Sequence, residues 1–306
     1  SIMLPPPRGG EKRRFEVSAS SNVITVLGTG TMGQGIAQVT AMAGHRTRVY
    51  DAAPERAKKA VEAIAAQLQK LVDKGKITAD ARTNALALLS NPDGVEEASQ
   101  GADIVIEAVP EDMALKVKLF TQVMEAAPAH VILASNTSSL SLTELGARVG
   151  APERTIGLHF FNPPPVMELL EIVRGLSTSD ATLELCLGFA KTLGKTPIIV
   201  RDSPGFATSR LGVILGCEAI RMLEQGVASA EDIDRAMELG YRHPMGPLKL
   251  GDLVGLDVRL AILEHLHKEL GEQFRPPALL RQMVRAGKLG KKSGEGFYKW
   301  PEEKKA

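Results

Sequence analysis

Short apolar runs alternate with amphipathic segments from Asn22 to about Val200. The runs are rich in β-branched residues and have the length of strands, whereas apolar positions in the segments between them recur with helical spacing. The runs lie at 22–28, 46–51, 102–109, 130–136, 154–161, 166–173 and 196–200, and the main helical segments at 54–75, 113–127 and 180–194. This alternation predicts a mostly parallel sheet covered by helices on both faces.

The ends of these helical segments carry residues of the expected types. Pro54 suits a first helical turn and Asp180 suits an N-cap. Gly75 and Gly194 suit the residue that follows a helix.

Beyond "RDSPGF" (201–206) the strand pattern stops. Helical spacing continues in 211–226, 229–240 and 256–271. Ser229, with Asp232 three residues later, resembles an N-terminal capping pattern. The chain is therefore predicted to form an α/β domain over 22–202 and an all-helical domain over 203–306.

Composition limits the possible partners and compartment. The chain has 306 residues, 44% of them hydrophobic, and its formal net charge of +1 gives no overall attraction to nucleic acid or an anionic membrane. No apolar run is long enough to span a bilayer. Cys186 and Cys217 lie in apolar helical patterns, so we expect buried, reduced thiols and a cytoplasmic location. Residues 1–21 contain "PPP" and "GG", lack a signal-peptide pattern and are expected to form a disordered tail.

The first predicted strand runs into a glycine-rich loop. "GTGTMG" (28–33) opens the helical pattern "MGQGIAQVTAMAG", and the next strand ends at Asp51. Gly28 permits a tight turn, Gly30 lets the backbone approach a pyrophosphate, and Gly33 lets helix and strand pack closely. Asp51 can bind the adenosine ribose hydroxyls and would repel a 2′-phosphate. The loop predicts a Rossmann-like domain that binds NAD in preference to NADP.

Polar residues gather at the ends of several predicted strands. "EAVPED" (107–112) and "SNTSSL" (135–140) follow two strands, and His159 and Asn162 lie at the end of a third. Ligands of open α/β sheets bind beyond the carboxyl ends of the strands, so these residues are expected to converge near the nicotinamide. The next run, "VMELLEIV" (166–173), is apolar on both faces yet carries two glutamates. At least one of them is expected to be buried with a partner.

Six motifs together carry a family resemblance. The glycine loop, "ASNTSSL", "GLHFFNP", "PGF", "HPMGP" and "GKKSGEGFY" occur in this order over residues 22–300. With them the chain resembles the L-3-hydroxyacyl-CoA dehydrogenase family, in particular its stand-alone bacterial members that act on 3-hydroxybutyryl-CoA. The resemblance implies an NAD domain, a helical domain that forms a homodimer, and an acyl-CoA substrate. It also implies reversible oxidation of a 3-hydroxyl group to a ketone.

Site residues follow from this resemblance, position by position. It places the catalytic histidine at His159, its partner carboxylate at Glu171, and substrate-holding groups at Ser138 and Asn162, whereas Glu168 is expected to be structural. Histidine suits a general base because it ordinarily titrates near neutral pH, and a carboxylate can fix its tautomer. The implied cofactor site consists of Gly28, Thr29, Gly30, Thr31, Met32, Gly33, Asp51, Glu111, Lys116, Ser138, Asn162 and Lys292.

The substrate site is less fully matched. A CoA-contacting lysine falls at Lys74, with Lys70 as the alternative. The family commonly has an asparagine after "PGF", where this chain has Ser209. Serine can still form one hydrogen bond to the substrate, so we expect activity to persist while chain-length preference stays open.

Two alternative functions remain open at this point. One is a CoA-independent 3-hydroxyacid dehydrogenase, whose lysine-bearing "GxxGxxxK"-like helix we do not find in the sequence. The other is a non-catalytic, crystallin-like dinucleotide-binding relative, which the joint presence of His159, Glu171 and Ser138 disfavours. No cysteine or histidine cluster has zinc-site spacing, so no metal is expected.

Overall fold

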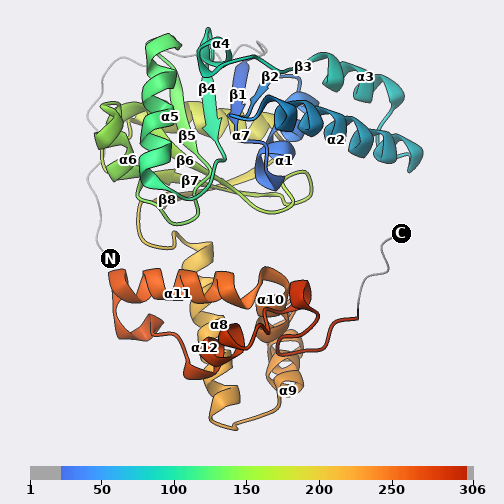
Figure 1. The fold of residues 1–306 in the computed structure, drawn as a ribbon, viewed down its shortest axis with the longest axis vertical. Coiled ribbons are helices and arrows are strands. Elements are labelled where there is room, and N and C mark those ends of the chain that lie inside the picture. Colours follow the sequence, from blue (N-terminus) through green and yellow to red (C-terminus); the bar gives the residue numbers. More distant parts are fainter. Residues whose placement is uncertain (1–21, 302–306) are drawn as a thin grey trace, which may run out of the picture.

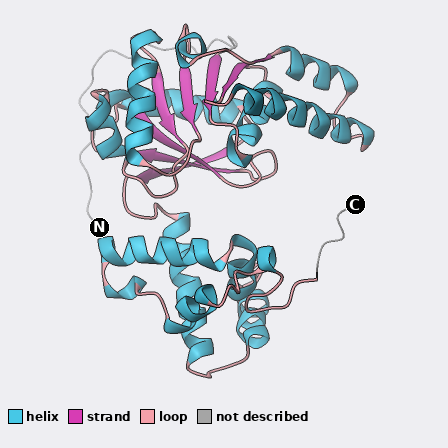
Figure 2. Ribbon diagram, in the orientation of Figure 1, coloured by secondary structure: helices cyan, strands magenta, loops and turns pink. Residues whose placement is uncertain are grey.

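The structure, a computed structural model, describes residues 22–301, and the tail expected at 1–21 lies outside the described residues. An eight-stranded sheet forms the first domain, in the order β3-β2-β1-β4-β5-β6-β7-β8 (Figures 1 and 2). Every neighbouring pair is parallel except β6 and β7, which are antiparallel. The strands are β1 (Val23–Leu27), β2 (Arg46–Tyr50), β3 (Leu89–Ser90), β4 (Ile104–Glu107), β5 (Ile132–Ser135), β6 (Thr155–Phe160), β7 (Leu169–Arg174) and β8 (Thr196–Arg201).

Helices fill the connections of the sheet and make up the second domain, which lies below it in Figure 1. Those of the first domain are α1 (Thr31–Met42), α2 (Pro54–Asp73), α3 (Ala79–Ala87), α4 (Val95–Ser99), α5 (Met113–Ala126), α6 (Leu142–Val149) and α7 (Asp180–Thr192). Those of the second are α8 (Thr208–Glu224), α9 (Ala230–Arg235), α10 (Pro247–Val254), α11 (Leu256–Leu270) and α12 (Ala278–Arg285). Single turns of 3₁₀ or π-helix lie at Pro152–Arg154, Ala236–Gly240, Glu272–Phe274 and Lys291–Ser293.

Alternate strand residues supply the two faces of the sheet. Ile104 and Ile106 of β4 join the core that includes α1, α2 and α7, whereas Val105 joins the core that includes α5 and α6. Both faces are therefore covered, which explains why the strands appear in the sequence as nearly continuous apolar runs. The predicted fold class, a mostly parallel Rossmann-like sheet followed by a helical domain, is confirmed.

The helix ends agree with the sequence at most positions and differ at one. Gly75 and Gly194 follow α2 and α7 with φ of +65° and +66°. Ser229 caps α9 by accepting a hydrogen bond from the backbone N–H of Asp232. The prediction that Asp180 caps α7 is wrong. Ser179 is the cap, because its hydroxyl accepts the backbone N–H of Thr182 at 3.2 Å, and Asp180 is the first helical residue.

The helical domain has its own core, and one buried carboxylate ties the C-terminal motif to it. Asp252 of α10 is 1% exposed. It accepts the backbone N–H groups of Phe297 and Tyr298 and the indole N–H of Trp300, each at 2.9 Å. A Cβ at Gly296 would lie 2.1 Å from the same carboxylate, so only glycine fits at this position of "GEGFY". This motif thus stabilises the helical domain.

Candidate active site

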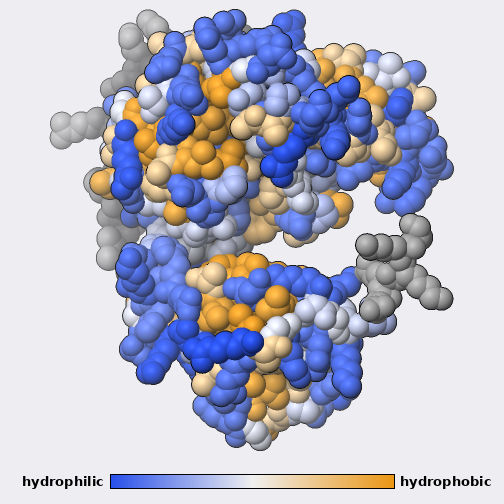
Figure 3. All heavy atoms as spheres, in the orientation of Figure 1, coloured by the Kyte–Doolittle hydropathy of each residue, from blue (hydrophilic) through white to orange (hydrophobic). Residues whose placement is uncertain are grey.

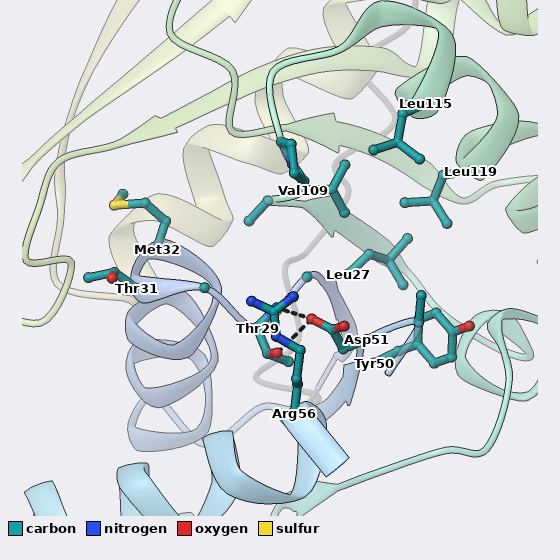
Figure 4. Close-up of a pocket in the computed structure, with 15 residues that line it drawn as sticks. Leu27, Thr29, Thr31, Met32, Tyr50, Asp51, Arg56, Val109, Leu115 and Leu119 are labelled. Carbon is teal, nitrogen blue, oxygen red and sulfur yellow. Dashed lines mark hydrogen bonds between the residues drawn. The ribbon is translucent and has the colours of Figure 1, made fainter. Parts of the chain in front are cut away.

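The glycine loop borders the first of two parts of the site. It joins β1 to α1 and lines a cavity of about 480 Å³ (Figure 4). Of the residues predicted for the cofactor, six line this cavity: Gly28, Thr29, Gly30, Thr31, Met32 and Asp51. Leu27, Val109, Leu115 and Leu119 add an apolar wall.

The structure requires glycine at two positions of the loop, Gly28 and Gly33, for different steric reasons. Gly28 has φ of +97°, and a Cβ there would lie 2.7 Å from the carbonyl oxygen of Ala108. A Cβ at Gly33 would lie 1.9 Å from the carbonyl oxygen of Gly28. Around Gly30 the space is open, with no atom within 4 Å of a Cβ position. The loop therefore closes tightly against its own strand and helix and leaves backbone exposed where a pyrophosphate would lie. These residues fit a dinucleotide.

Asp51 lies at the end of β2, on the wall of this cavity. Its carboxylate accepts the backbone N–H of Thr29 at 3.0 Å, the Thr29 hydroxyl at 2.6 Å and the backbone N–H of Ala53 at 3.1 Å. Burial would raise the pKa of Asp51, but these hydrogen bonds and the nearby Arg56 outweigh it and lower the pKa. The carboxylate is therefore ionised at neutral pH, and Figure 4 shows Arg56 beside it.

The histidine and one glutamate of the opening motif form a direct pair. His159 of β6 lies opposite Glu171 of β7 in the antiparallel register, and its Nδ1 is 2.6 Å from Glu171 Oε2. Glu171 is 0% exposed and His159 7%. Glu168, by contrast, is exposed just before β7 begins. The prediction that at least one of the two glutamates is buried with a partner is therefore confirmed, and that residue is Glu171.

Glu171 has further partners that the sequence did not indicate. Its carboxylate accepts the Thr208 hydroxyl at 3.0 Å, and the backbone N–H groups of Thr208 at 2.9 Å and Ala207 at 3.2 Å. Burial would raise the pKa of Glu171, but the hydrogen bonds from His159 and Thr208 lower it. The carboxylate thus lies at the N-terminus of α8, which favours negative charge. The only local signal for Thr208 was its position shortly after "PGF".

Aromatic rings enclose the imidazole. The ring of Phe161 lies 4.6 Å from that of His159, and the ring of Phe206 lies 5.8 Å away in an edge-on arrangement. Within residues 22–301 the Nε2 atom of His159 has no hydrogen-bond partner. One ring nitrogen is therefore held by Glu171, and the other is free to meet a ligand.

Ser138 lies on a turn that Glu111 holds in place. The Glu111 carboxylate accepts the Thr137 hydroxyl, the backbone N–H of Ser138 at 3.1 Å and the Ser139 hydroxyl at 2.9 Å. Burial would raise the pKa of Glu111, but the Lys116 ammonium and these hydrogen bonds lower it. Glu111 therefore positions the turn, and the Ser138 hydroxyl makes no hydrogen bond within the described chain.

Lys116 is buried behind this turn. It is 1% exposed and forms ion pairs with Glu107 at 2.7 Å and Glu111 at 3.2 Å. Glu107 is 0% exposed and also accepts the Ser135 hydroxyl at 2.7 Å. Neither Lys116 nor Glu111 lines the cavity at the glycine loop. Glu107 is a site residue that the sequence showed only as part of "EAVPED".

The other predicted residues make no hydrogen bond to the His159–Glu171 pair. Asn162 is exposed just after β6, and Ser209 of α8 follows Thr208. Lys74 and Lys70 are exposed at the end of α2. Lys292 lies in the helical domain, where it forms an ion pair with Asp257 at 2.6 Å, and it does not line the cofactor cavity.

The described part of the chain contains neither a cluster of metal ligands nor a membrane-spanning helix. Among residues 22–301 no group of three or more His, Cys, Asp or Glu side chains could hold a metal ion. In the same part of the chain no helix is both long and apolar enough to cross a membrane. Cys186 and Cys217 are both buried free thiols, and burial raises the pKa of Cys186 to about 12.

Fold and site together define a two-domain, dinucleotide-dependent dehydrogenase with a histidine–carboxylate pair. Comparison with known proteins gives the family. The model "3-hydroxyacyl-CoA dehydrogenase, NAD binding domain" matches residues 23–203, and "3-hydroxyacyl-CoA dehydrogenase, C-terminal domain" matches 205–300. The chain belongs to the 3-hydroxyacyl-CoA dehydrogenase family.

Individual relatives agree over nearly the whole chain. A Bacillus subtilis protein described as "Probable 3-hydroxybutyryl-CoA dehydrogenase" is 47% identical, over 92% of this chain and 98% of its own length. The 3-hydroxybutyryl-CoA dehydrogenase of Clostridioides difficile is 41% identical, over 90% and 98%. The crystal structure of (S)-3-hydroxybutyryl-CoA dehydrogenase from Ralstonia eutropha superposes with a TM-score of 0.89 at 43% identity, covering 92% of this chain and 100% of that one.

Proposed function

We propose that this protein catalyses the reversible oxidation of (3S)-3-hydroxyacyl-CoA, with 3-hydroxybutyryl-CoA as the expected substrate, to 3-oxoacyl-CoA. The observation that carries the proposal is the His159–Glu171 pair at the carboxyl end of β6, in a domain whose glycine loop fits a dinucleotide. The similarity to the Ralstonia eutropha enzyme over the whole length of that chain supports the substrate. When bound, NAD supplies the acceptor for the hydride.

His159 would accept the proton of the substrate hydroxyl. Because the pKa of Glu171 is lowered, its carboxylate is ionised and can only accept hydrogen bonds, so Nδ1 of His159 carries a proton. The lone pair is then on Nε2, which has no hydrogen-bond partner within the described residues. Glu171 stabilises the imidazolium that forms, and in the reverse direction Nε2 returns the proton.

Other predicted residues would hold the ligands. The side chains of Ser138 and Asn162 have no hydrogen-bond partner among residues 22–301, so both are available to the substrate oxygens and the nicotinamide. Ser209 would contact the acyl group, and Lys74 or Lys70 the CoA phosphates. Glu111 and Lys116 would act on the cofactor side through the turn they brace.

In this proposal Lys292 contacts the cofactor. The NAD-binding domain comprises residues 22–202, and the helical domain comprises residues 203–306. We also propose a cytoplasmic location.

The helical domain would form a homodimer. Apolar side chains gather on the face of this domain at α10 and α11 (Figure 3), where Leu253 and Val258 are 40% and 42% exposed.

One assay separates this function from the two alternatives. The purified protein is mixed with NADH or NADPH and either acetoacetyl-CoA or free acetoacetate, and loss of reduced cofactor is followed. Oxidation of NADH with the CoA ester alone supports the proposal, activity on the free acid alone supports a CoA-independent enzyme, and no activity supports a binding protein. His159→Gln should still bind NADH but lose about 10²–10⁴-fold in kcat. Near wild-type turnover would rule out His159 as the base.

A further inference from the structure

Arg259 is a buried cation without a carboxylate. It lies on α11 and is 7% exposed. Its only hydrogen bond within residues 22–301 runs from Nη1 to the carbonyl oxygen of Gly212, at 3.0 Å, and its Nε is buried without any partner. Burial lowers the pKa of the guanidinium, and no acidic group opposes that effect. Buried charges are normally paired, so Arg259 lacks a partner that its surroundings call for.

Other buried charged side chains of the protein have the partners that Arg259 lacks. Lys116 has Glu107, and Glu171 has His159. Asp234, which is 3% exposed, accepts the Tyr298 hydroxyl at 2.7 Å and two backbone N–H groups. Each of these groups is satisfied within residues 22–301, whereas the guanidinium of Arg259 is not. No residue of this part of the chain supplies its missing partner, so a bound anion can supply it.

Arg259 lines a cavity close to the histidine. This cavity has a volume of about 240 Å³, and Arg259 is the only charged residue that lines it among residues 22–301. Phe161, whose ring contacts His159, and Thr208, whose hydroxyl contacts Glu171, form part of its wall. Ser209 is beside them. The cavity thus shares two of its lining residues with the contacts of the proposed catalytic pair, and Arg259 is a third lining residue.

The remaining wall suits methylene groups. Val213, Leu250, Val254 and Ile262 also line it and are apolar. A Cβ at Gly216 of α8 would be 3.7 Å from Nη1 of Arg259, an ordinary van der Waals distance. Apolar walls together with one cation match an aliphatic chain that ends in an anion.

We propose that this cavity receives the far end of a longer acyl chain and that Arg259 binds a carboxylate there, so that the protein accepts dicarboxylic 3-hydroxyacyl-CoA esters in addition to 3-hydroxybutyryl-CoA. The proposal rests on the function proposed above and names a substrate class for the same site. A terminal carboxylate would give the guanidinium its missing hydrogen bonds. A terminal methyl group would instead leave a dehydrated charge without a partner.

Binding of two unreactive ligands tests this directly. Adipyl-CoA and hexanoyl-CoA have six acyl carbons each, differ at the chain end, and lack the 3-hydroxyl, so calorimetry measures affinity without turnover. Wild-type protein should bind adipyl-CoA about 10- to 100-fold more tightly, as expected for a hydrogen-bonded charge pair. Equal affinities, or tighter binding of hexanoyl-CoA, would overturn the proposal whatever any variant does.

Variants assign the preference to Arg259. Arg259→Met should remove most of the difference between the two ligands, and Arg259→Lys, which keeps the charge, should retain part of it. Arg221→Met is the matched control, because Arg221 also donates to backbone carbonyls of the helical domain, those of Gln273 and Arg275, but does not line the cavity. If the control lowers the preference as much as Arg259→Met does, the effect is structural and the proposal fails.

Measurements of turnover distinguish a failure of this inference from a failure of the proposed function. Oxidation of 3-hydroxyadipyl-CoA and 3-hydroxyhexanoyl-CoA is measured with NAD on the same preparations. Activity on both without preference, together with equal binding, contradicts the role of Arg259 and leaves the dehydrogenase function standing. Arg259-dependent binding without any oxidation supports the anion site and contradicts the dehydrogenase.

Discussion

Replacing Glu171 by glutamine tests the centre of the proposed mechanism. Glutamine has nearly the same shape, and its one carbonyl oxygen can still accept the backbone N–H groups of Ala207 and Thr208. Its amide nitrogen must then face His159 Nδ1 and the Thr208 hydroxyl, where the wild-type carboxylate accepts at 2.6 and 3.0 Å. Because the amide is a donor, Nδ1 must give up its proton and become an acceptor, which moves the ring proton to Nε2.

The structure sets the size of the expected effects. With Nε2 protonated, the imidazole cannot take the substrate proton, and in a serine-protease triad the equivalent change lowers kcat by about 10⁴-fold. We expect a loss of about 10³–10⁴-fold here. Of the four hydrogen bonds to the carboxylate, two lose their acceptor altogether and the other two become bonds to a neutral oxygen. The free energy of unfolding should therefore fall by roughly 2–4 kcal/mol.

The pH dependence of stability follows from the direction of the pKa shift. The folded protein lowers the pKa of Glu171, so ionisation stabilises the fold above the unfolded pKa of about 4.3. That stabilisation is lost as the pH falls through the lower, folded pKa. The difference in Tm between wild type and Glu171→Gln should accordingly be large at neutral pH and shrink on acidification.

Three measurements decide the outcome. They are kcat for NADH oxidation with acetoacetyl-CoA, the affinity for NADH, and Tm as a function of pH. Glu168→Gln is the matched control, because Glu168 is an exposed acid only three residues away and should leave all three unchanged. If Glu171→Gln retained more than a tenth of wild-type kcat, the tautomer argument would be refuted. If Tm fell while kcat did not, Glu171 would be structural only.

Three further variants test the surrounding site. Gly33→Ala places a Cβ 1.9 Å from the Gly28 carbonyl oxygen, so NADH affinity, measured by fluorescence titration, should fall at least about tenfold; unchanged affinity would contradict the loop assignment. Asp51→Asn should lower the ratio of kcat/KM for NADH to that for NADPH by roughly 10- to 100-fold, and a constant ratio would mean that Asp51 does not select the cofactor. Lys116→Met leaves buried Glu107 without its ammonium and should cost about 3–5 kcal/mol in urea denaturation, whereas a loss below about 1 kcal/mol would show that the pair is not essential to the fold.

The sequence predicted the elements that have a strong local signal. Long apolar runs gave seven of the eight strands, but β3 consists of Leu89 and Ser90 alone and no periodicity can show so short an element. Asp180 was mistaken for the cap of α7 because serine and aspartate are both good caps and lie next to each other there. Propensity therefore located the helix, and the geometry of one hydroxyl group decided where it begins.

The site residues also divide into those that a local sequence pattern predicts and those that it does not. His159 and the glycine loop have local signatures, whereas Thr208, Glu107 and Arg259 do not. An arginine in an amphipathic helix normally lies on the surface, and only the packing of α11 on α8 buries this one. Burial and missing partners depend on contacts between elements that are far apart in the sequence, which spacing along the chain does not encode.

The contacts of Glu171 connect the two domains through the proposed chemistry. Its carboxylate lies at the first turn of α8, and α8 carries Ser209 and holds Arg259 through the Gly212 carbonyl. One ionised side chain thus orients the imidazole and also fixes the helix that forms a wall of the acyl cavity. Loss of Glu171 should therefore lower kcat and raise KM together. Ser209→Ala, which leaves the imidazole and its partner in place, should act mainly on KM, so the pair of variants separates proton transfer from placement of the acyl chain.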